Sequence, residues 1–185
     1  MIRIIDFFIA FIGLFVFWPV LVFVALMGYF DTGSPIFVQE RVGKNRRPFK
    51  LIKFRTMSVD TKSVASHLVN TASITKLGSF LRKTKIDELP QLINVLKGEM
   101  SLVGPRPNLF NQEELIKERE DRGVYNVLPG ITGLAQVKAI DMSTPKLLAE
   151  TDQKMISSLT ITDYFKYIMM TATGSGSGDR VSNKN

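Results

Sequence analysis

The sequence predicts an α+β protein with an N-terminal membrane anchor, a small, mainly helical domain and a flexible tail. A long uncharged run opens the chain, two short segments of alternating polarity follow, and apolar residues at helical spacing occupy most of the rest. We expect the anchor at residues 1–30, the domain at residues 31–173 and the tail, which has linker composition, at residues 174–185. A chain of 185 residues is long enough for one such domain with a hydrophobic core.

The anchor is predicted from "FFIAFIGLFVFWPVLVFVALMGYF", residues 7–30, which contains no charged side chain. As a helix this run would reach roughly 36 Å, enough to cross the hydrocarbon core of a bilayer at about 30 Å. A cleaved signal peptide would have a shorter apolar core, of about 7–15 residues, followed by a cleavage site of small residues. The run has neither feature, so we expect it to be retained as an anchor.

Pro19 lies near the middle of the anchor, where it removes one backbone donor, so a kink is expected after Trp18. Two topologies remain open: a kinked helix that spans the bilayer, which is the more frequent case, or two halves of roughly 18 Å that enter and return. Basic side chains crowd the stretch after the anchor and place the domain in the cytoplasm by the positive-inside rule. They are Arg41, Lys44, Arg46, Arg47, Lys50, Lys53 and Arg55.

The next two segments, "SPIFVQERVG" and "RPFKLIKFRTM", are rich in Ile, Val and Phe and flank a Gly-Lys-Asn turn region. They predict a short β-hairpin. On its second strand Lys53 and Arg55 would share one face, while Ile52 and Phe54 share the other. The two cations could therefore bind one anion together, and a solvated basic face beside the membrane is the alternative.

Charge and composition narrow the classes of partner and chemistry. The net charge of +7 and pI near 9.7 indicate an anionic partner, either nucleic acid, lipid head groups or phosphorylated small molecules. Zero cysteines exclude a disulfide framework, a thiolate zinc site and a cysteine nucleophile. The single histidine, His67, excludes a multi-histidine metal site and is expected on the surface. The basic residues alternate with carboxylates rather than stacking aromatics, so we do not expect a nucleic acid partner.

Three stretches have the apolar spacing of amphipathic helices. The first covers residues 89–97 and stops at Gly98, and the second lies within residues 108–125, with its charges on a solvated face. Residues 145–173 supply one or two more, which could lie against protein or at the lipid interface. "LPGITGLAQV", between the second and third stretches, is expected to be a turn-rich loop.

The candidate chemistry lies in "TKIDELPQ", where Asp87 and Glu88 are adjacent. If Asp87 caps the helix, Pro90 falls in its first turn and withholds the amide that would normally bond to the cap. An ionised, partly free carboxylate at a helix end that attracts phosphate suits nucleophilic attack on phosphorus. Glu88 would point about 100° away and could handle a proton or a metal. The alternative is that both are ordinary acidic residues of a first helical turn.

Cations near this dyad in the sequence, together with two from the hairpin, could bind a pyrophosphate, because arginine makes bidentate contacts to phosphate oxygens. "GPRP" is a rigid turn that presents Arg106 between Pro105 and Pro107. The full cationic set is Lys53, Arg55, Arg82 and Arg106.

Several of these motifs together resemble the bacterial sugar transferases, in particular the small monotopic phosphoglycosyl transferases that start membrane glycan assembly. The matching pieces cover most of residues 33–138 in the order of the family. They are "GSPIFVQERVG", "FKLIKFRTM", "LGSFLRKTKIDELPQLINVLKGEMSLVGPRP" and "PGITGLAQV".

The resemblance implies a two-step reaction with Mg²⁺. Asp87 would attack the β-phosphate of a UDP-sugar, expel UMP and form a phosphosugar-aspartate, which a polyprenyl (undecaprenyl) phosphate then attacks. Asp87 is also the implied Mg²⁺ contact, and Glu88 completes the dyad. The implied substrate-binding residues are Lys53, Arg55, Arg82, Pro105, Arg106 and Pro107.

The resemblance also implies a re-entrant helix-break-helix that enters one leaflet of the bacterial inner membrane, with both ends and the catalytic domain in the cytoplasm. The short form is similar to enzymes that use N-acetylated or diacetamido UDP-sugars. Three positions depart from the family pattern: Trp18-Pro19 stands for Ser-Pro, Leu134 for Trp, and Arg46 for Gly.

Two other functional classes remain open at this point, and the sugar and oligomeric state are open as well. One is a membrane-anchored glycosyl transferase or phosphohydrolase without a covalent intermediate. The other is a non-enzymatic basic module that binds anionic lipid, which would need neither Asp87 nor Glu88.

Overall fold

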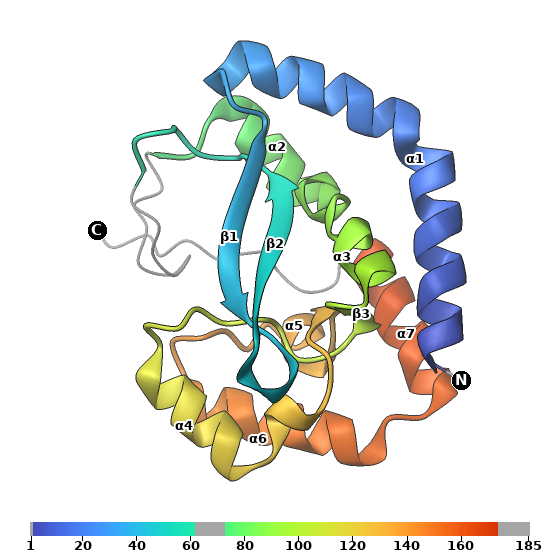
Figure 1. Cartoon of the computed structure of the whole chain (residues 1–185), viewed down its shortest axis with the longest axis vertical. Helices are drawn as coiled ribbons and strands as arrows, with labels where there is room; N and C mark the ends of the chain where they lie inside the picture. Colours follow the sequence, from blue (N-terminus) through green and yellow to red (C-terminus); the bar gives the residue numbers. More distant parts are fainter. Residues whose placement is uncertain (1, 62–72, 174–185) are drawn as a thin grey trace.

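The computed structural model describes residues 2–61 and 73–173. A long N-terminal helix runs along the top and the right side of a mixed α/β body that contains two small two-stranded sheets (Figure 1). The prediction for His67 and that for the tail at residues 174–185 lie outside the described residues. The α+β class predicted from the sequence is confirmed for the part that the structure describes.

The anchor is a single helix, α1 (Ile2–Thr32), with Pro19 inside it. Figure 1 shows α1 as two arms that meet at a bend near its middle. The helix is bent but not broken, because its hydrogen-bonded pattern continues through Trp18 and Pro19. Within the described residues α1 is the one helix long and apolar enough to cross a membrane. Most of its large apolar side chains are exposed, including Phe15 and Trp18.

The N-terminal arm of α1 is attached to the body through Asp6, whose side chain is only 1% exposed. Oδ1 of Asp6 accepts hydrogen bonds from the Tyr164 hydroxyl (2.6 Å), the Leu102 amide (2.8 Å) and the Ser101 hydroxyl (3.0 Å). A carboxylate surrounded by donors can remain buried, because these bonds replace those it loses to water.

The C-terminal arm of α1 is attached by apolar packing. Val24 packs in a small cluster with Phe54 and Leu81, all of them buried. Farther along, Gly28 lies so close to the Pro35 ring that a Cβ there would be 3.0 Å from the Pro35 Cβ. Both arms of α1 therefore contact the same body.

The predicted hairpin is confirmed. Strand β1 (Ile36–Val42) pairs antiparallel with β2 (Pro48–Phe54), and the short 3₁₀ segment η1 (Lys44–Arg46) connects them. As expected, Lys53 and Arg55 lie on one face, with their charged groups 5.6 Å and 5.3 Å from the centre of the Phe37 ring. Arg46, where the family pattern has glycine, adopts a left-handed φ of 60° that glycine tolerates more easily.

A second sheet was not predicted. β3 (Ser101–Val103) runs parallel to β4 (Gly130–Thr132), so the expected loop "LPGITGLAQV" contains a strand and a short helix, α5 (Leu134–Val137). Gly104, which follows β3, lies against Gly130, the first residue of β4, and a Cβ on Gly130 would collide with the backbone nitrogen of Gly104. Strands of three residues are too short to show a period-2 pattern, which explains the wrong prediction.

Further helical segments lie in the C-terminal half of the body, and in Figure 1 the last of them lies at the right, beside the N-terminal arm of α1. They are α4 (Glu113–Asp121), the 3₁₀ turn η5 (Val124–Asn126), α6 (Pro145–Ser158) and α7 (Ile161–Ala172). The solvated charged face predicted for α4 is wrong at Arg119, which is 1% exposed and pairs with Asp152 of α6. The two helices expected near the C-terminus are confirmed, and contact of α7 with lipid stays a prediction.

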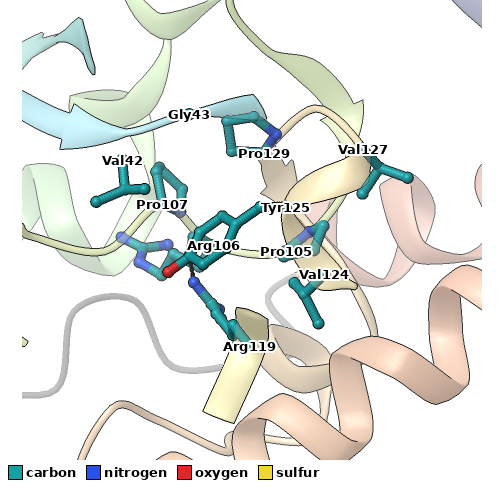
Figure 2. A pocket seen from close by; sticks show the side chains of 10 residues that line it. All are labelled: Val42, Gly43, Pro105, Arg106, Pro107, Arg119, Val124, Tyr125, Val127 and Pro129. Carbon is teal, nitrogen blue, oxygen red and sulfur yellow. Dashed lines mark hydrogen bonds between the residues drawn. The ribbon is translucent and has the colours of Figure 1, made fainter. Parts of the chain in front are cut away.

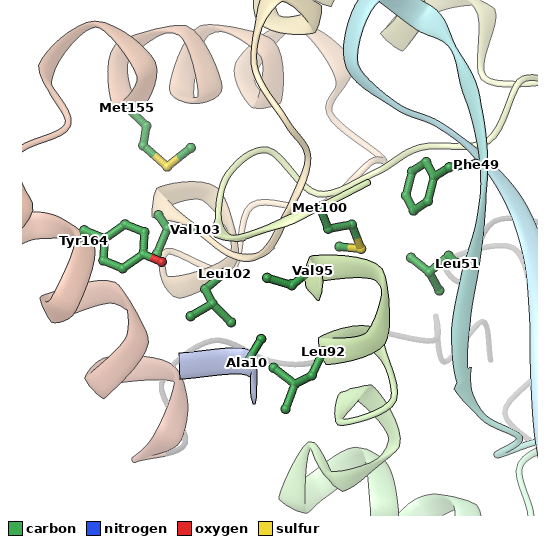
Figure 3. Packing of buried hydrophobic residues seen from close by; sticks show 10 residues of the cluster. All are labelled: Ala10, Phe49, Leu51, Leu92, Val95, Met100, Leu102, Val103, Met155 and Tyr164. Carbon is green, nitrogen blue, oxygen red and sulfur yellow. The ribbon is translucent and has the colours of Figure 1, made fainter. Parts of the chain in front are cut away.

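The main core joins α1 to the body. Figure 3 shows Ala10 of α1 beside Leu92, with Leu102 next to them and Tyr164 farther along, beside Val103. Further buried members of this cluster come from β2, the helix after the dyad, β3 and α6. The anchor is therefore part of the hydrophobic core and not a separate attachment.

We predict that Asp6→Ala destabilises the protein by roughly 2–4 kcal/mol, because three buried donors would lose their acceptor. Thermal unfolding in detergent micelles, followed by circular dichroism, measures the effect. The matched control is Asp31→Ala, which removes an exposed carboxylate at the other end of α1 and should change stability by less than about 0.5 kcal/mol. Equal melting of the two variants would contradict the role given to Asp6.

Candidate active site

The acidic dyad lies in a tight connection between two helices. Helix α2 (Lys76–Thr84) ends at Lys85, which has a left-handed φ of 58°, and the 3₁₀ turn η4 (Ile86–Glu88) follows directly. Helix α3 (Gln91–Lys97) then begins after Pro90 and stops at Gly98. The left-handed residue ends α2, so the dyad lies in a short turn with a helix on each side.

The prediction that Asp87 caps this helix is wrong, because α3 begins only at Gln91 and Pro90 occupies its cap position. Asp87 lies one turn earlier, inside η4. The expected role of Pro90 changes with it. Pro90 starts the helix at no cost in hydrogen bonds, since the first helical amides have no partner within the helix. Asp87 therefore does lie close to the N-terminus of α3, as predicted, but it belongs to the 3₁₀ turn before the helix and does not cap it.

Both carboxylates of the dyad are nearly buried, with exposed fractions of 5% for Asp87 and 8% for Glu88. The Nη2 atom of Arg106 lies 2.7 Å from Oε1 of Glu88 and donates a hydrogen bond to it. Arg106 belongs to the Pro-Arg-Pro loop that follows β3. Dyad and loop, which were predicted separately, are therefore in direct contact.

A small cationic cleft lies beside this ion pair. Its lining residues are Arg41, Leu51, Lys53, Gln91, Arg106, Pro107 and Gly130. Arg41 donates from Nη1 to the carbonyl of Pro107 (3.2 Å) and from Nη2 to Gln39 (2.5 Å). Lys53 is buried against the same cleft. Three cations of different segments thus meet next to the dyad, which is an arrangement suited to phosphate oxygens.

Sequence reasoning missed Arg41 and Gln91 as members of this cleft. Arg41 could have been found, because it occupies the same face of β1 as Phe37, which pairs with Lys53 across the hairpin. Gln91 carried no such signal, since its position depends on where α3 begins.

Two of the predicted cations make hydrogen bonds to neighbouring segments. Arg55 donates from Nε to the carbonyl of Ser34 (2.8 Å), and Arg82 donates from Nε to the Thr56 hydroxyl (2.9 Å). Neither side chain is among the residues that line the cleft. These contacts link the end of the hairpin to α2 and to the residues between α1 and β1. A role of either arginine in binding substrate stays a prediction.

An apolar cavity of about 420 Å³ opens on the other side of the dyad. It is walled by α1, α3, α7 and the second sheet, and its lining is Ile9, Gly13, Phe17, Thr84, Lys85, Ile86, Glu88, Leu89, Leu92, Leu102, Ile131, Thr132, Ile168, Thr171 and Ala172. Its polar end contains Lys85 and Glu88, and the sequence did not single out Lys85. Burial lowers the pKa of Lys85, and Arg106 lowers it further, while Glu88 and Asp87 oppose the shift.

Figure 2 shows the far side of the Pro-Arg-Pro loop. There Pro105, Arg106 and Pro107 line a shallow hollow together with Tyr125 and Arg119. Burial raises the pKa of the Tyr125 hydroxyl, so this group stays neutral at physiological pH. Arg106 is thus contacted on two sides: Arg119 donates a hydrogen bond to its backbone carbonyl, and its guanidinium donates one to Glu88.

The chain matches the family model described as bacterial sugar transferase over residues 1–176. It is 38% identical over 178 residues to an exopolysaccharide production protein of Rhizobium leguminosarum bv. phaseoli, covering 90% of this chain and 88% of the relative.

Two longer relatives match in part. A sugar transferase of Haemophilus influenzae is 40% identical over 164 residues, covering 77% of this chain and 34% of the relative. The UDP-glucose:undecaprenyl-phosphate glucose-1-phosphate transferase of Escherichia coli (strain K12) is 44% identical over 124 residues, covering 64% and 27%. The chain therefore spans about a third or less of these two proteins. Since the family model covers nearly its whole length, the chain belongs to the bacterial sugar transferase family.

Proposed function

We propose that the protein transfers a sugar 1-phosphate from a UDP-sugar to a polyprenyl phosphate, which yields UMP and a polyprenyl diphosphate sugar. One observation carries the proposal: the Glu88–Arg106 ion pair joins two different sites. Arg106 lines the cationic cleft, while Glu88 lines the apolar cavity. A dyad between a phosphate site and a lipid-sized cavity fits an enzyme that moves a phosphosugar from a nucleotide to a lipid.

In the first step Asp87 is the nucleophile. Its carboxylate oxygen bonds to the sugar-bearing phosphorus while the bond from that phosphorus to the bridging oxygen breaks, and UMP leaves with the bridging oxygen. Arg106 and Lys53 lie at the cleft where the negative charge of the leaving phosphate develops. UDP-sugars with an N-acetyl group remain the expected donors.

A magnesium ion fits the residues present. No cluster of three His, Asp or Glu that could hold a metal occurs in residues 2–61 and 73–173. Mg²⁺ usually needs less, because one or two carboxylates and substrate phosphate oxygens complete its shell. Asp87 would hold it, and the ion would neutralise charge on the diphosphate.

In the second step the acceptor phosphate attacks the phosphosugar-aspartate, and Asp87 is released as a free carboxylate. The isoprenoid chain of the acceptor occupies the apolar cavity between α1 and α7. Lys85 and Glu88 at the polar end then face its phosphate group. This assignment is consistent with the lining, which is apolar everywhere except near the dyad and at Thr132 and Thr171.

The proposal includes a re-entrant anchor, with the catalytic domain on the cytoplasmic face of the bacterial inner membrane. Two observations support it: both arms of α1 pack on one body, and the apolar side chains around the bend are exposed. A helix that crossed about 30 Å of hydrocarbon would separate its two ends, so it could not keep both contacts.

We predict that Asp87→Asn lowers UMP release from UDP-sugars by on the order of 10³-fold or more and abolishes the radiolabelled protein–phosphosugar adduct. The amide keeps the shape of the carboxylate but is a poor nucleophile. A panel of UDP-sugars with undecaprenyl phosphate and Mg²⁺, assayed on detergent-solubilised protein, provides both readouts. Asp121→Asn, an exposed carboxylate on α4, is the matched control.

Other outcomes of this assay would overturn parts of the proposal. Full activity of Asp87→Asn would rule out Asp87 as the nucleophile. Release of UDP in place of UMP would indicate a glycosyl transferase, and turnover of the sugar nucleotide to free sugar phosphate without acceptor would indicate a phosphohydrolase.

We predict that Ala172→Trp, which fills the cavity from α7, raises the KM for undecaprenyl phosphate at least about 10-fold and leaves adduct formation unchanged. The reason is that only the second step uses the cavity. Thr173→Trp places the same ring on the neighbouring residue, which does not line the cavity, and should behave as wild type. An equal loss in both half-reactions would disprove the assignment of the cavity to the acceptor.

Cysteine labelling tests the anchor topology, because the natural chain contains no cysteine. We predict that a cysteine introduced at Ile2 reacts with an impermeant maleimide only when the cytoplasmic side is open, as does a control cysteine at Glu114 on α4. Labelling at Ile2 from the periplasmic side of intact cells would show a spanning helix instead.

A further inference from the structure

Outside the dyad, a buried arginine lies on α4: the side chain of Arg119 is only 1% exposed. Its Nη2 and Nε atoms donate to Oδ2 of Asp152, at 2.7 Å and 3.1 Å. Asp152 lies on α6 and is fully buried. The two charges are therefore paired in the interior between two helices that contact each other.

The second end of the Arg119 guanidinium reaches the Pro-Arg-Pro loop. Its Nη1 atom donates to the backbone carbonyl of Arg106 (2.8 Å) and to Oδ1 of Asn108 (2.9 Å). The Tyr125 hydroxyl donates to the same Asn108 oxygen (3.0 Å). In Figure 2 Arg119 lies next to Arg106 and Tyr125, on the side of the loop away from Val42.

The loop is also attached to the hairpin, since the amide of Val42 donates to the carbonyl of Asn108 (2.9 Å). Arg106 is thus held at its backbone by Arg119, while its side chain extends to Glu88. Small shifts of this backbone would move the guanidinium away from the dyad.

Stability alone is a poor reason for this arrangement. Taking two charges out of water costs about as much as their attraction returns, and apolar residues of similar volume often stabilise equally well. Oδ1 of Asp152 also has no hydrogen-bond partner among the described residues. Burial accordingly raises the pKa of Asp152, against the effect of the Arg119 charge. A buried ion pair with an unbonded carboxylate oxygen contributes little to stability, which indicates a role other than stability.

We propose that Arg119, oriented by Asp152, is a positioning residue that fixes the Pro-Arg-Pro loop so that the guanidinium of Arg106 meets Glu88 and the donor phosphates. Arg119 touches no substrate in this scheme. Its effect on the rate rests on the proposed function, whereas its effect on the loop does not.

The test replaces both charges at once, in Arg119→Met/Asp152→Leu, because removal of the whole pair leaves no unpaired charge inside. We expect near-normal melting and a loss of roughly 10- to 100-fold in kcat/KM for UMP release, since a displacement of about 1 Å at a reacting group has that effect. The KM for undecaprenyl phosphate should stay unchanged. Arg122→Met is the control and should match wild type, because it removes a partly exposed arginine at the C-cap of α4 that pairs with Glu118.

A double-mutant cycle with Arg106→Ala separates positioning from general support. If Arg119 acts through Arg106, adding the Arg119/Asp152 replacement to Arg106→Ala causes less than about a twofold further loss of UMP release. Multiplication of the two losses would overturn the proposal and leave Arg119 a structural residue.

Hydrogen exchange gives a readout that does not depend on activity. We expect faster amide exchange in a peptide covering residues 104–109 of the Arg119→Met/Asp152→Leu variant, with α3 and α7 unchanged. If the double variant does not fold, Asp152→Asn serves instead, since it keeps an acceptor for Arg119 but weakens the charge that orients it. Unchanged exchange at residues 104–109 would refute the positioning role. If the wild type releases no UMP but the double variant still exchanges faster at these residues, only the proposed function is refuted.

Discussion

The arrangement of the site depends on the close approach of two backbones, at Gly104 and Gly130. A side chain at either glycine would collide with the backbone of the other segment, so β3 and β4 can pair only because both residues lack one. This pairing fixes the course of the Pro-Arg-Pro loop, which follows β3 directly and lies beside the dyad. The Glu88–Arg106 contact follows from it, and so does the cleft that borders Arg106.

Buried charge is used in two different ways in this molecule. Asp6 is surrounded by three donors from β3 and α7, and it attaches the anchor to the body. The Arg119–Asp152 pair is less well satisfied and contacts the loop that carries Arg106. All three donors around Asp6 bond to its carboxylate, whereas Arg119 donates some of its hydrogen bonds to Arg106 and Asn108 and not to Asp152. Both connect elements that apolar packing alone would leave free to slide.

The anchor explains why so much apolar surface is compatible with a basic, otherwise polar chain. One side of α1 completes the hydrophobic core, and its other side exposes large aromatic and aliphatic residues. Such a surface is larger than a water-soluble protein normally exposes, and contact with lipid, as proposed, would remove the cost of exposing it. The same helix walls the apolar cavity, so a lipid substrate would reach the dyad without leaving an apolar environment.

The predicted cations were only partly brought together. Lys53 and Arg106 line one cleft, but Arg55 and Arg82 hold the hairpin to its neighbours. All four looked equivalent in the sequence, because each is a basic residue near a motif. Which of them line the cleft depends on the path of β2 and on the loop after β3, and neither is encoded in local spacing.

By itself the sequence determined the features that depend on near neighbours: the apolar anchor, the hairpin, the helix stop at Gly98 and the adjacent carboxylates. Periodicity and turn chemistry act over a few residues, so they can be read without a fold. Only the tertiary structure decided where α3 begins, that two three-residue strands pair, that Arg119 is buried and that a cavity borders Glu88. Each of these depends on contacts between distant segments, such as Arg119 with Asp152, whose energy appears only when the chain is packed.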